Sequence, residues 1–121
     1  MTVDAYVSSR IYKPLQLSHI GFRPSSWYPM DKIVPTEEDR YFRYCRIQGY
    51  VHDMGAAMRG GVSGHAGLFA DSHDVGILMQ MLLNGGYYGG RRLLHPFTVA
   101  LFTARPDNEL RRGLGFDMKQ L

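Results

Sequence analysis

Apolar residues recur with the 3.6-residue period of a helix at the start of this chain. The residues that share this face are Val3, Tyr6, Val7 and Ile11. Thr2 stands where a helix N-cap is favoured, and Asp4 adds a negative charge to the first turn. Pro14 disfavours helical backbone in the residue before it, so the helix is predicted to end near Tyr12.

The clearest helical pattern lies between Asp71 and Asn84. Its predicted buried stripe consists of Val75, Leu78, Met79 and Leu82. Asp71 or Ser72 can cap this helix, and Asp74 suits the positive end of the helix dipole. The helix is predicted to end at Asn84-Gly85-Gly86, because glycine adopts the left-handed conformation freely.

Proline, glycine and aspartate mark the shorter elements. His95-Pro96 opens a third predicted helix that runs to about Thr103, with proline at its first position. Asp53 is placed to cap a short helix over residues 54–58. Gly89-Gly90 separates two strand-like runs, which predicts a hairpin. A terminal strand is predicted from the alternation of Leu114, Phe116 and Met118 with polar or small residues.

The region between the first two of these helices is less regular. Residues 15–35 carry Pro24, Ser25, Ser26 and Pro29 and predict a long surface connection. Thr36–Asp39 has the spacing of a capping box, which predicts a short helix from about Glu37. An extended run is the alternative, because Tyr41, Tyr44 and Ile47 would suit one. The predicted fold class is therefore mainly α, with a short hairpin and one terminal strand.

Composition narrows the function classes. The 121 residues are enough for one domain, and 45% hydrophobic with 21% charged residues is typical of a folded globular chain. The net charge of +3 comes without a stripe of basic and aromatic residues, so no nucleic-acid partner is expected. No apolar run reaches the length of a membrane span. Cys45 is the single cysteine, and we expect its thiol to be packed or half-buried.

The stretch Gly60–Phe69, GGVSGHAGLF, raises the question of a serine nucleophile. Glycines allow a serine to occupy a sharp turn, and the imidazole of His65 could take the Ser63 proton. The Gly-x-Ser-x-Gly elbow of α/β-hydrolases is not matched, because the second glycine comes one place early. No serine has a lysine three residues later. We therefore interpret Ser63 as part of a glycine loop, with the nucleophile as the alternative.

The sequence contains residues for two further kinds of site. A cluster of His52, Asp53, His65, His73 and Asp74 could supply zinc ligands, but its spacing fits no zinc motif. We therefore predict no metal and no other cofactor, with a metal-dependent hydrolase using His52, His65 and His73 as an alternative. The adjacent carboxylates Glu37, Glu38 and Asp39 point in different directions along a chain and predict a solvated turn rather than an acid–base pair.

The order of motifs along the chain is more specific than any single one. The motifs are IYKPLQLSHIGF, PTEEDRYFR, GYVHD, GGVSGHAGLFADSHDVGILMQMLLNGG, LHPFTVALFT and RGLGFDM. Together they resemble one segment of the serine β-lactamase-like family, which includes class C β-lactamases, penicillin-binding-protein-like enzymes and related esterases. The resemblance covers nearly the whole chain, with VHD to LLNGG as its most specific part.

This resemblance implies a segment of an α+β domain. The family's Ser-x-x-Lys, Tyr-x-Asn and Lys/His-Thr-Gly motifs do not occur here, so residues 1–121 are expected to be a single incomplete domain, the helical middle, with no catalytic residue of its own. Ser63, Gly64, His65 and Ala66 correspond to the rim of the family's active site. His52 and Asp53 match its VHD motif and are expected to position the loop.

The resemblance also sets the functional expectations. The parent would be a serine hydrolase that forms an acyl-enzyme with a β-lactam, a D-Ala-D-Ala peptide or an ester, and it would work outside the cytoplasm. This chain alone is expected to be inactive, and its partners would be the missing parts of its own domain and the parent's substrate. The alternative is a non-enzymatic helical module that binds a partner or a second copy of itself through exposed apolar faces.

Overall fold

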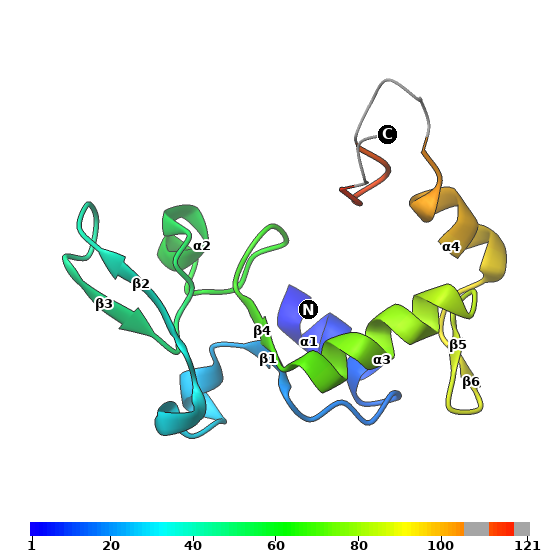
Figure 1. Ribbon diagram of the computed structural model, residues 1–121, viewed down its shortest axis with the longest axis horizontal. Helices are drawn as coiled ribbons and strands as arrows, with labels where there is room; N and C mark the ends of the chain where they lie inside the picture. Colours follow the sequence, from blue (N-terminus) through cyan, green and yellow to red (C-terminus); the bar gives the residue numbers. More distant parts are fainter. Residues whose placement is uncertain (106–111, 118–121) are drawn as a thin grey trace. The chain divides into compact units, whose positions relative to one another are not determined.

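The computed structural model describes residues 1–105 and 112–117 and divides the chain into two compact units, Met1–Val75 and Gly76–Leu121 (Figure 1). Each unit mixes helices with short strand pairs, so the structure is more strand-rich than the mainly helical prediction. Within the described residues, no helix has the length and apolar character needed to cross a membrane.

The first unit begins with α1, Val3–Val7, which continues into a π-helical segment, Ser8–Tyr12. The predicted helix is therefore confirmed in extent, although the Thr2 side chain makes no cap hydrogen bond. Its apolar face is largely uncovered, since Val3 and Tyr6 are exposed. Tyr12 is the residue of this stretch that reaches the core.

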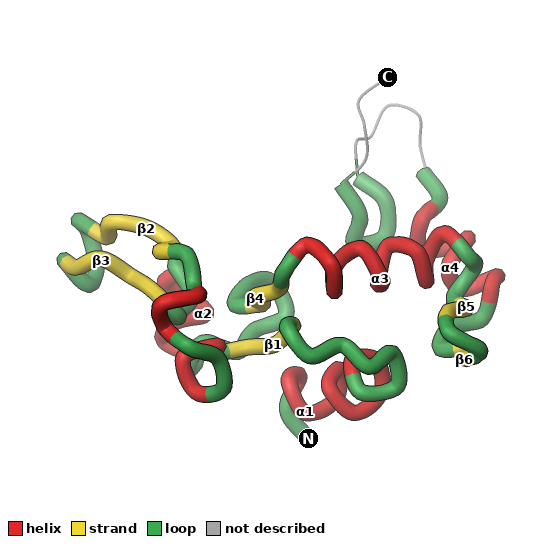
Figure 2. The backbone as a smooth tube through the Cα atoms, turned by 60° about the horizontal axis from the view of Figure 1, so that its bottom comes forward, coloured by secondary structure: helices red, strands yellow, loops and turns green. Residues whose placement is uncertain are grey.

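Two antiparallel strand pairs follow in the first unit (Figure 2). β1, Ile20–Phe22, pairs with β4, Leu68–Ala70, so Ile20 lies opposite Ala70. β2, Pro35–Asp39, pairs with β3, Cys45–Gln48, with a bulge near its start. Both views place the short helix α2, Met54–Met58, beside the β2–β3 hairpin. The core of this unit consists of Tyr12, Leu15, Leu17, Ile20, Ile33, Ile47, Val51 and Ala56.

These pairings correct two predictions. The connection over residues 15–35 contains β1 as well as two 3-10 turns, Pro24–Ser26 and Met30–Lys32. The capping-box helix from Glu37 is wrong and the extended alternative is right, because cross-strand hydrogen bonds to β3 replace the helical ones. Cys45 lies on β3 with an exposed side chain, against the expectation of a packed thiol.

The helix α3, Ser72–Leu83, is confirmed, but its predicted buried stripe is wrong at two of its four residues, since Leu78 and Leu82 are half-buried. Val75 and Met79 are exposed, whereas Asp74 and Met81, seven residues apart on one face, are buried. The Asp74 carboxylate accepts the backbone N–H of His19 at 2.7 Å. In the first turn of α3, this tertiary hydrogen bond rather than the apolar pattern determines that the Asp74 side is buried.

In the second unit, β5, Tyr87–Tyr88, and β6, Arg91–Arg92, form the predicted hairpin. α4, Pro96–Thr103, also follows the prediction, with the His95 imidazole accepting the N–H of Phe97. The predicted terminal strand is wrong over residues 112–117, which turn back on themselves through a bridge between Arg112 and Asp117. Met118 lies outside the described residues.

The glycine loop between α2 and β4 closes tightly on itself. Gly67 has φ +107°, and a Cβ added there would collide with the carbonyl oxygen of Gly61. Gly64, in the same loop, has open space around it and no positive φ. A side chain is therefore excluded at Gly67 but not at Gly64.

Gly67→Ala should lower the free energy of unfolding by about 1–3 kcal/mol, because it combines a strained φ with a backbone collision. Urea denaturation of the 121-residue chain measures this change. The matched control, Gly64→Ala, should change the free energy by no more than about 0.5 kcal/mol. Equal effects of the two substitutions would show that the loop does not close as described.

Candidate functional site

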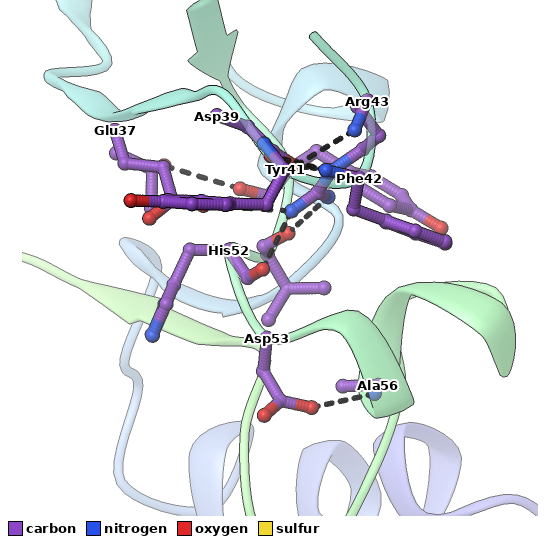
Figure 3. A network of polar contacts seen from close by, with 11 residues as sticks. Glu37, Asp39, Tyr41, Phe42, Arg43, His52, Asp53 and Ala56 are labelled. Carbon is purple, nitrogen blue, oxygen red and sulfur yellow. Dashed lines mark hydrogen bonds and ion pairs between the residues drawn. The ribbon is translucent and has the colours of Figure 1, made fainter.

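The loop at the end of the β2–β3 hairpin is organised by a buried carboxylate, that of Asp39 (Figure 3). Asp39 Oδ1 accepts the backbone N–H groups of Tyr41 at 3.0 Å and Phe42 at 2.8 Å. Oδ2 accepts the backbone N–H and the Nε–H of Arg43, at 3.1 and 2.8 Å. The Arg43 side chain and these amides hold the pKa of the Asp39 carboxyl well below its usual range. Asp39 is therefore an ionised structural group, which argues against an acid–base pair at Glu37–Asp39.

The other edge of the Arg43 guanidinium holds a second segment of chain. Nη1 donates to the carbonyl of Val51 at 2.7 Å, and Nη2 donates to that of His52 at 2.5 Å. Glu37 forms a longer ion pair with Nη2, at 3.8 Å. The planar guanidinium can satisfy a carboxylate and two carbonyls at once, which an ammonium could not do in this geometry. Arg43 thus fixes the backbone that leads into Asp53.

Asp53 links this backbone to the glycine loop. Its Oδ1 accepts the N–H of Ala56 at 2.7 Å, so it caps α2 as predicted. The same oxygen lies 3.0 Å from Nε2 of His65, and Nδ1 of His65 lies 2.8 Å from the Ser63 hydroxyl. The Ala56 N–H and then the His65 imidazole hold the pKa of Asp53 below its usual value. In the neutral imidazole, Nε2–H donates to the ionised Asp53, and Nδ1 accepts from Ser63.

Ser63, His65 and Asp53 are hydrogen-bonded in the order of a catalytic triad, but here they hold the glycine loop in place. Ser63 is buried, with 9% of its surface exposed, whereas the imidazole of His65 is 59% exposed. A nucleophile must reach the substrate, and here the imidazole faces solvent while the hydroxyl is covered. The three side chains therefore pin the glycine loop to the start of α2.

A surface depression of about 380 Å³ lies next to these three side chains. It is lined by Thr36, Val51, His52, His65, Ala66, Gly67, Leu68 and Phe69. Two of the predicted rim residues, His65 and Ala66, are therefore in its wall together with His52. Ser63 and Gly64, the other two, are in the same loop but not in the wall, Ser63 being buried and Gly64 exposed. The depression offers two imidazoles and an apolar floor to a ligand.

The three histidines of the metal-dependent alternative do not form one group close enough to share a metal among the described residues. Among residues 1–105 and 112–117, the group of acidic and imidazole side chains close enough to share a metal is Asp71, His73 and Asp74, within 4.8 Å. His52 and His65 are not in it. Asp71 caps α3 by accepting the N–H of Asp74 at 2.8 Å, and Asp74 accepts from His19. Helix capping accounts for the Asp71 carboxylate, and the tertiary hydrogen bond from His19 accounts for that of Asp74.

Sequence reasoning missed the pair that holds the site, Asp39 and Arg43. Their spacing of four residues was a possible signal, since an acid and a base so placed can meet across a turn. The contacts of Arg43 with Val51 and His52 have no such signal, because backbone carbonyls are present at every residue.

Comparisons with known proteins relate the chain to peptidases. It is 43% identical over 128 aligned positions to curated proteins from Salmonella agona, Salmonella gallinarum and Salmonella newport, each named "Putative D-alanyl-D-alanine carboxypeptidase". The alignment covers 96% of this chain and 30% of each relative. No protein-family model and no solved structure matches the chain. The similarity is thus to proteins named for a carboxypeptidase activity, and it gives no support to the helical interaction module or to class C β-lactamases in particular.

Arg43→Lys should reduce the free energy of unfolding by about 2 kcal/mol, because lysine cannot hold Asp39 and the two carbonyls together. Urea denaturation measures the loss, and Arg40→Lys, at an exposed neighbouring position, is the matched control. A loss no larger than that of Arg40→Lys would contradict the role of the guanidinium.

Stability should also depend on pH through Asp39. Since folding lowers its pKa, the ionised carboxyl stabilises the native state above its ordinary pKa of about 4, and this stabilisation is lost as the pH falls below that value. Asp39→Asn should therefore have a lower urea midpoint than the unchanged chain at pH 7, and the difference should shrink between about pH 5 and pH 2. Glu38→Gln, at an exposed carboxyl on the same strand, should show no such convergence.

Proposed function

We propose that this chain is part of a serine hydrolase that removes the last residue of peptides ending in D-Ala-D-Ala, and that it supplies part of the rim of the substrate pocket. The observation that carries the proposal is the 43% identity to proteins named as D-alanyl-D-alanine carboxypeptidases over 96% of the chain. Because the chain spans 30% of the length of these relatives, the remaining parts of such an enzyme are assigned to polypeptide beyond these 121 residues.

The proposed reaction proceeds through an acyl-enzyme. A serine outside these 121 residues attacks the carbonyl carbon of the terminal peptide bond, and free D-alanine leaves after its nitrogen gains a proton. Water then cleaves the ester and returns the serine. Ser63 is not assigned this role, because its side chain is buried in the glycine loop.

The contribution of this chain is to orient the peptide. The depression presents the imidazole of His52, which can exchange hydrogen bonds with peptide groups, and the ring of His65, whose two nitrogens are already bonded to Asp53 and Ser63. Ala66, Leu68 and Phe69 can contact short apolar side chains. His65 is held by Asp53, and the segment of His52 is held by Arg43. A rim fixed in this way holds its groups in one geometry before substrate binds. Less conformational entropy is then lost on binding.

A graft tests the proposal. The aligned segment of the Salmonella agona relative is replaced with this chain, and D-alanine release from a peptide ending in D-Ala-D-Ala is measured. The graft should retain activity, and His65→Ala in the grafted segment should lower kcat/KM roughly tenfold through lost positioning. Ser63→Ala should keep most of the activity.

One control variant and two contrary outcomes complete the test. His73→Ala removes an exposed imidazole that is not in the depression, so it should leave kcat/KM nearly unchanged. Loss of all turnover in Ser63→Ala, with the fold intact by circular dichroism, would make Ser63 the nucleophile and overturn the assignment. If the graft is inactive while the unmodified relative is active, the proposed function is refuted.

A further inference from the structure

A second cavity in the first unit has a different chemical character. It encloses about 300 Å³ between residues 24–34 and the end of β4. Four rings line it, those of His19, Trp27, Tyr28 and Phe69, together with the charged groups of Lys32 and Asp71. None of the residues Ser63–Ala66 lines this cavity, and Phe69 is the residue that it shares with the depression at His65.

The rings form walls rather than a flat platform. His19 and Tyr28 meet at 75° with centroids 5.4 Å apart, and Trp27 and Tyr28 meet at 66° with centroids 5.8 Å apart. The indole N–H of Trp27 donates to the carbonyl of Phe22 at 2.8 Å. Gly21 allows the indole to pack closely, since a Cβ there would lie 3.1 Å from Cζ2 of Trp27. The Trp27 wall is therefore fixed before any ligand binds.

The fixed charge of the cavity is negative. Asp71 is held on both oxygens, with Oδ1 accepting the N–H of Asp74 at 2.8 Å and Oδ2 lying 2.9 Å from Nδ1 of His19. The amide of Asp74, with a smaller contribution from His19, lowers the pKa of the Asp71 carboxyl, so it is ionised. Lys32, by contrast, is 68% exposed and has only a 4.0 Å ion pair with Asp31. Its ammonium can turn to solvent while its stem stays against the apolar wall.

We propose that this cavity binds an alkylammonium group. The negative faces of aromatic rings attract a cation through their quadrupoles, and a fixed carboxylate beside the rings adds direct charge attraction. A small quaternary amine and the amino end of a basic side chain both supply such a group. The proposal does not rest on the proposed hydrolase function, although the two cavities share Phe69.

The single tryptophan of the sequence makes the test direct, since all indole fluorescence comes from the wall of the cavity. The 121-residue chain is titrated with choline and with 3,3-dimethylbutan-1-ol, which has the same shape with carbon in place of the charged nitrogen. Choline should give a saturable change in Trp27 emission, and the neutral isostere should bind at least tenfold more weakly. Nα-acetyl-lysine amide distinguishes the sources: stronger binding than choline indicates a basic side chain, and weaker binding indicates a quaternary amine.

Charge variants test the sign of the field. Asp71→Asn keeps a side chain that can cap α3 but removes the charge, so choline should bind about fivefold to tenfold more weakly. Lys32→Gln removes the opposing charge and should strengthen binding, and this variant alters no helix cap. Glu38→Gln, at an exposed carboxyl outside the cavity, should change the affinity less than twofold. Equal binding of choline and its isostere, or no saturable change with choline and the lysine amide, would overturn the proposal.

Discussion

The contact between Asp39 and Arg43 is the constraint on which the rest of the site depends. A buried carboxylate must be paired and hydrogen-bonded, and here three amides and a guanidinium meet that demand within four residues of chain. Because the same guanidinium also binds the carbonyls of Val51 and His52, it joins the hairpin loop to the segment before α2. Asp53, His65 and Ser63 extend this network to the glycine loop. The pairing of one buried carboxylate at the hairpin thus helps to fix the position of groups that would face a substrate.

Local signals in the sequence predicted elements well where the determining interactions are also local. The cap at Asp53, the start of α4 at His95-Pro96 and the glycine hairpin after α3 each depend on residues within one turn of one another. The pairing of β1 with β4 joins residues about fifty positions apart, and no periodicity near Ile20 indicates its partner. The buried face of α3 was missed for the same reason, since a carboxylate bonded to the distant backbone of His19 decides it.

The candidate site was anticipated in part. The motif order marked the residues from His52 to Ala66 as one region, and the structure joins His65 with Asp53 and Ser63 and places His65 and Ala66 in one wall. Their role at a substrate rim stays a prediction. The spacing of Ser63 and His65 could not reveal which of the two is covered, because exposure depends on how the loop folds back. The positive φ of Gly67 and its closeness to Gly61 determine that fold, and they became visible only with the backbone in place.

Phe69 lines both cavities of the first unit, the depression that contains His65 and the aromatic cavity that contains Trp27. It lies on β4, held opposite Gly21 by the pairing with β1. A ligand that displaces this ring in one cavity necessarily reshapes the wall of the other. Occupancy of the two cavities is then thermodynamically linked through a single side chain. If one ligand changes the affinity of the protein for the second, the second changes the affinity for the first by the same factor.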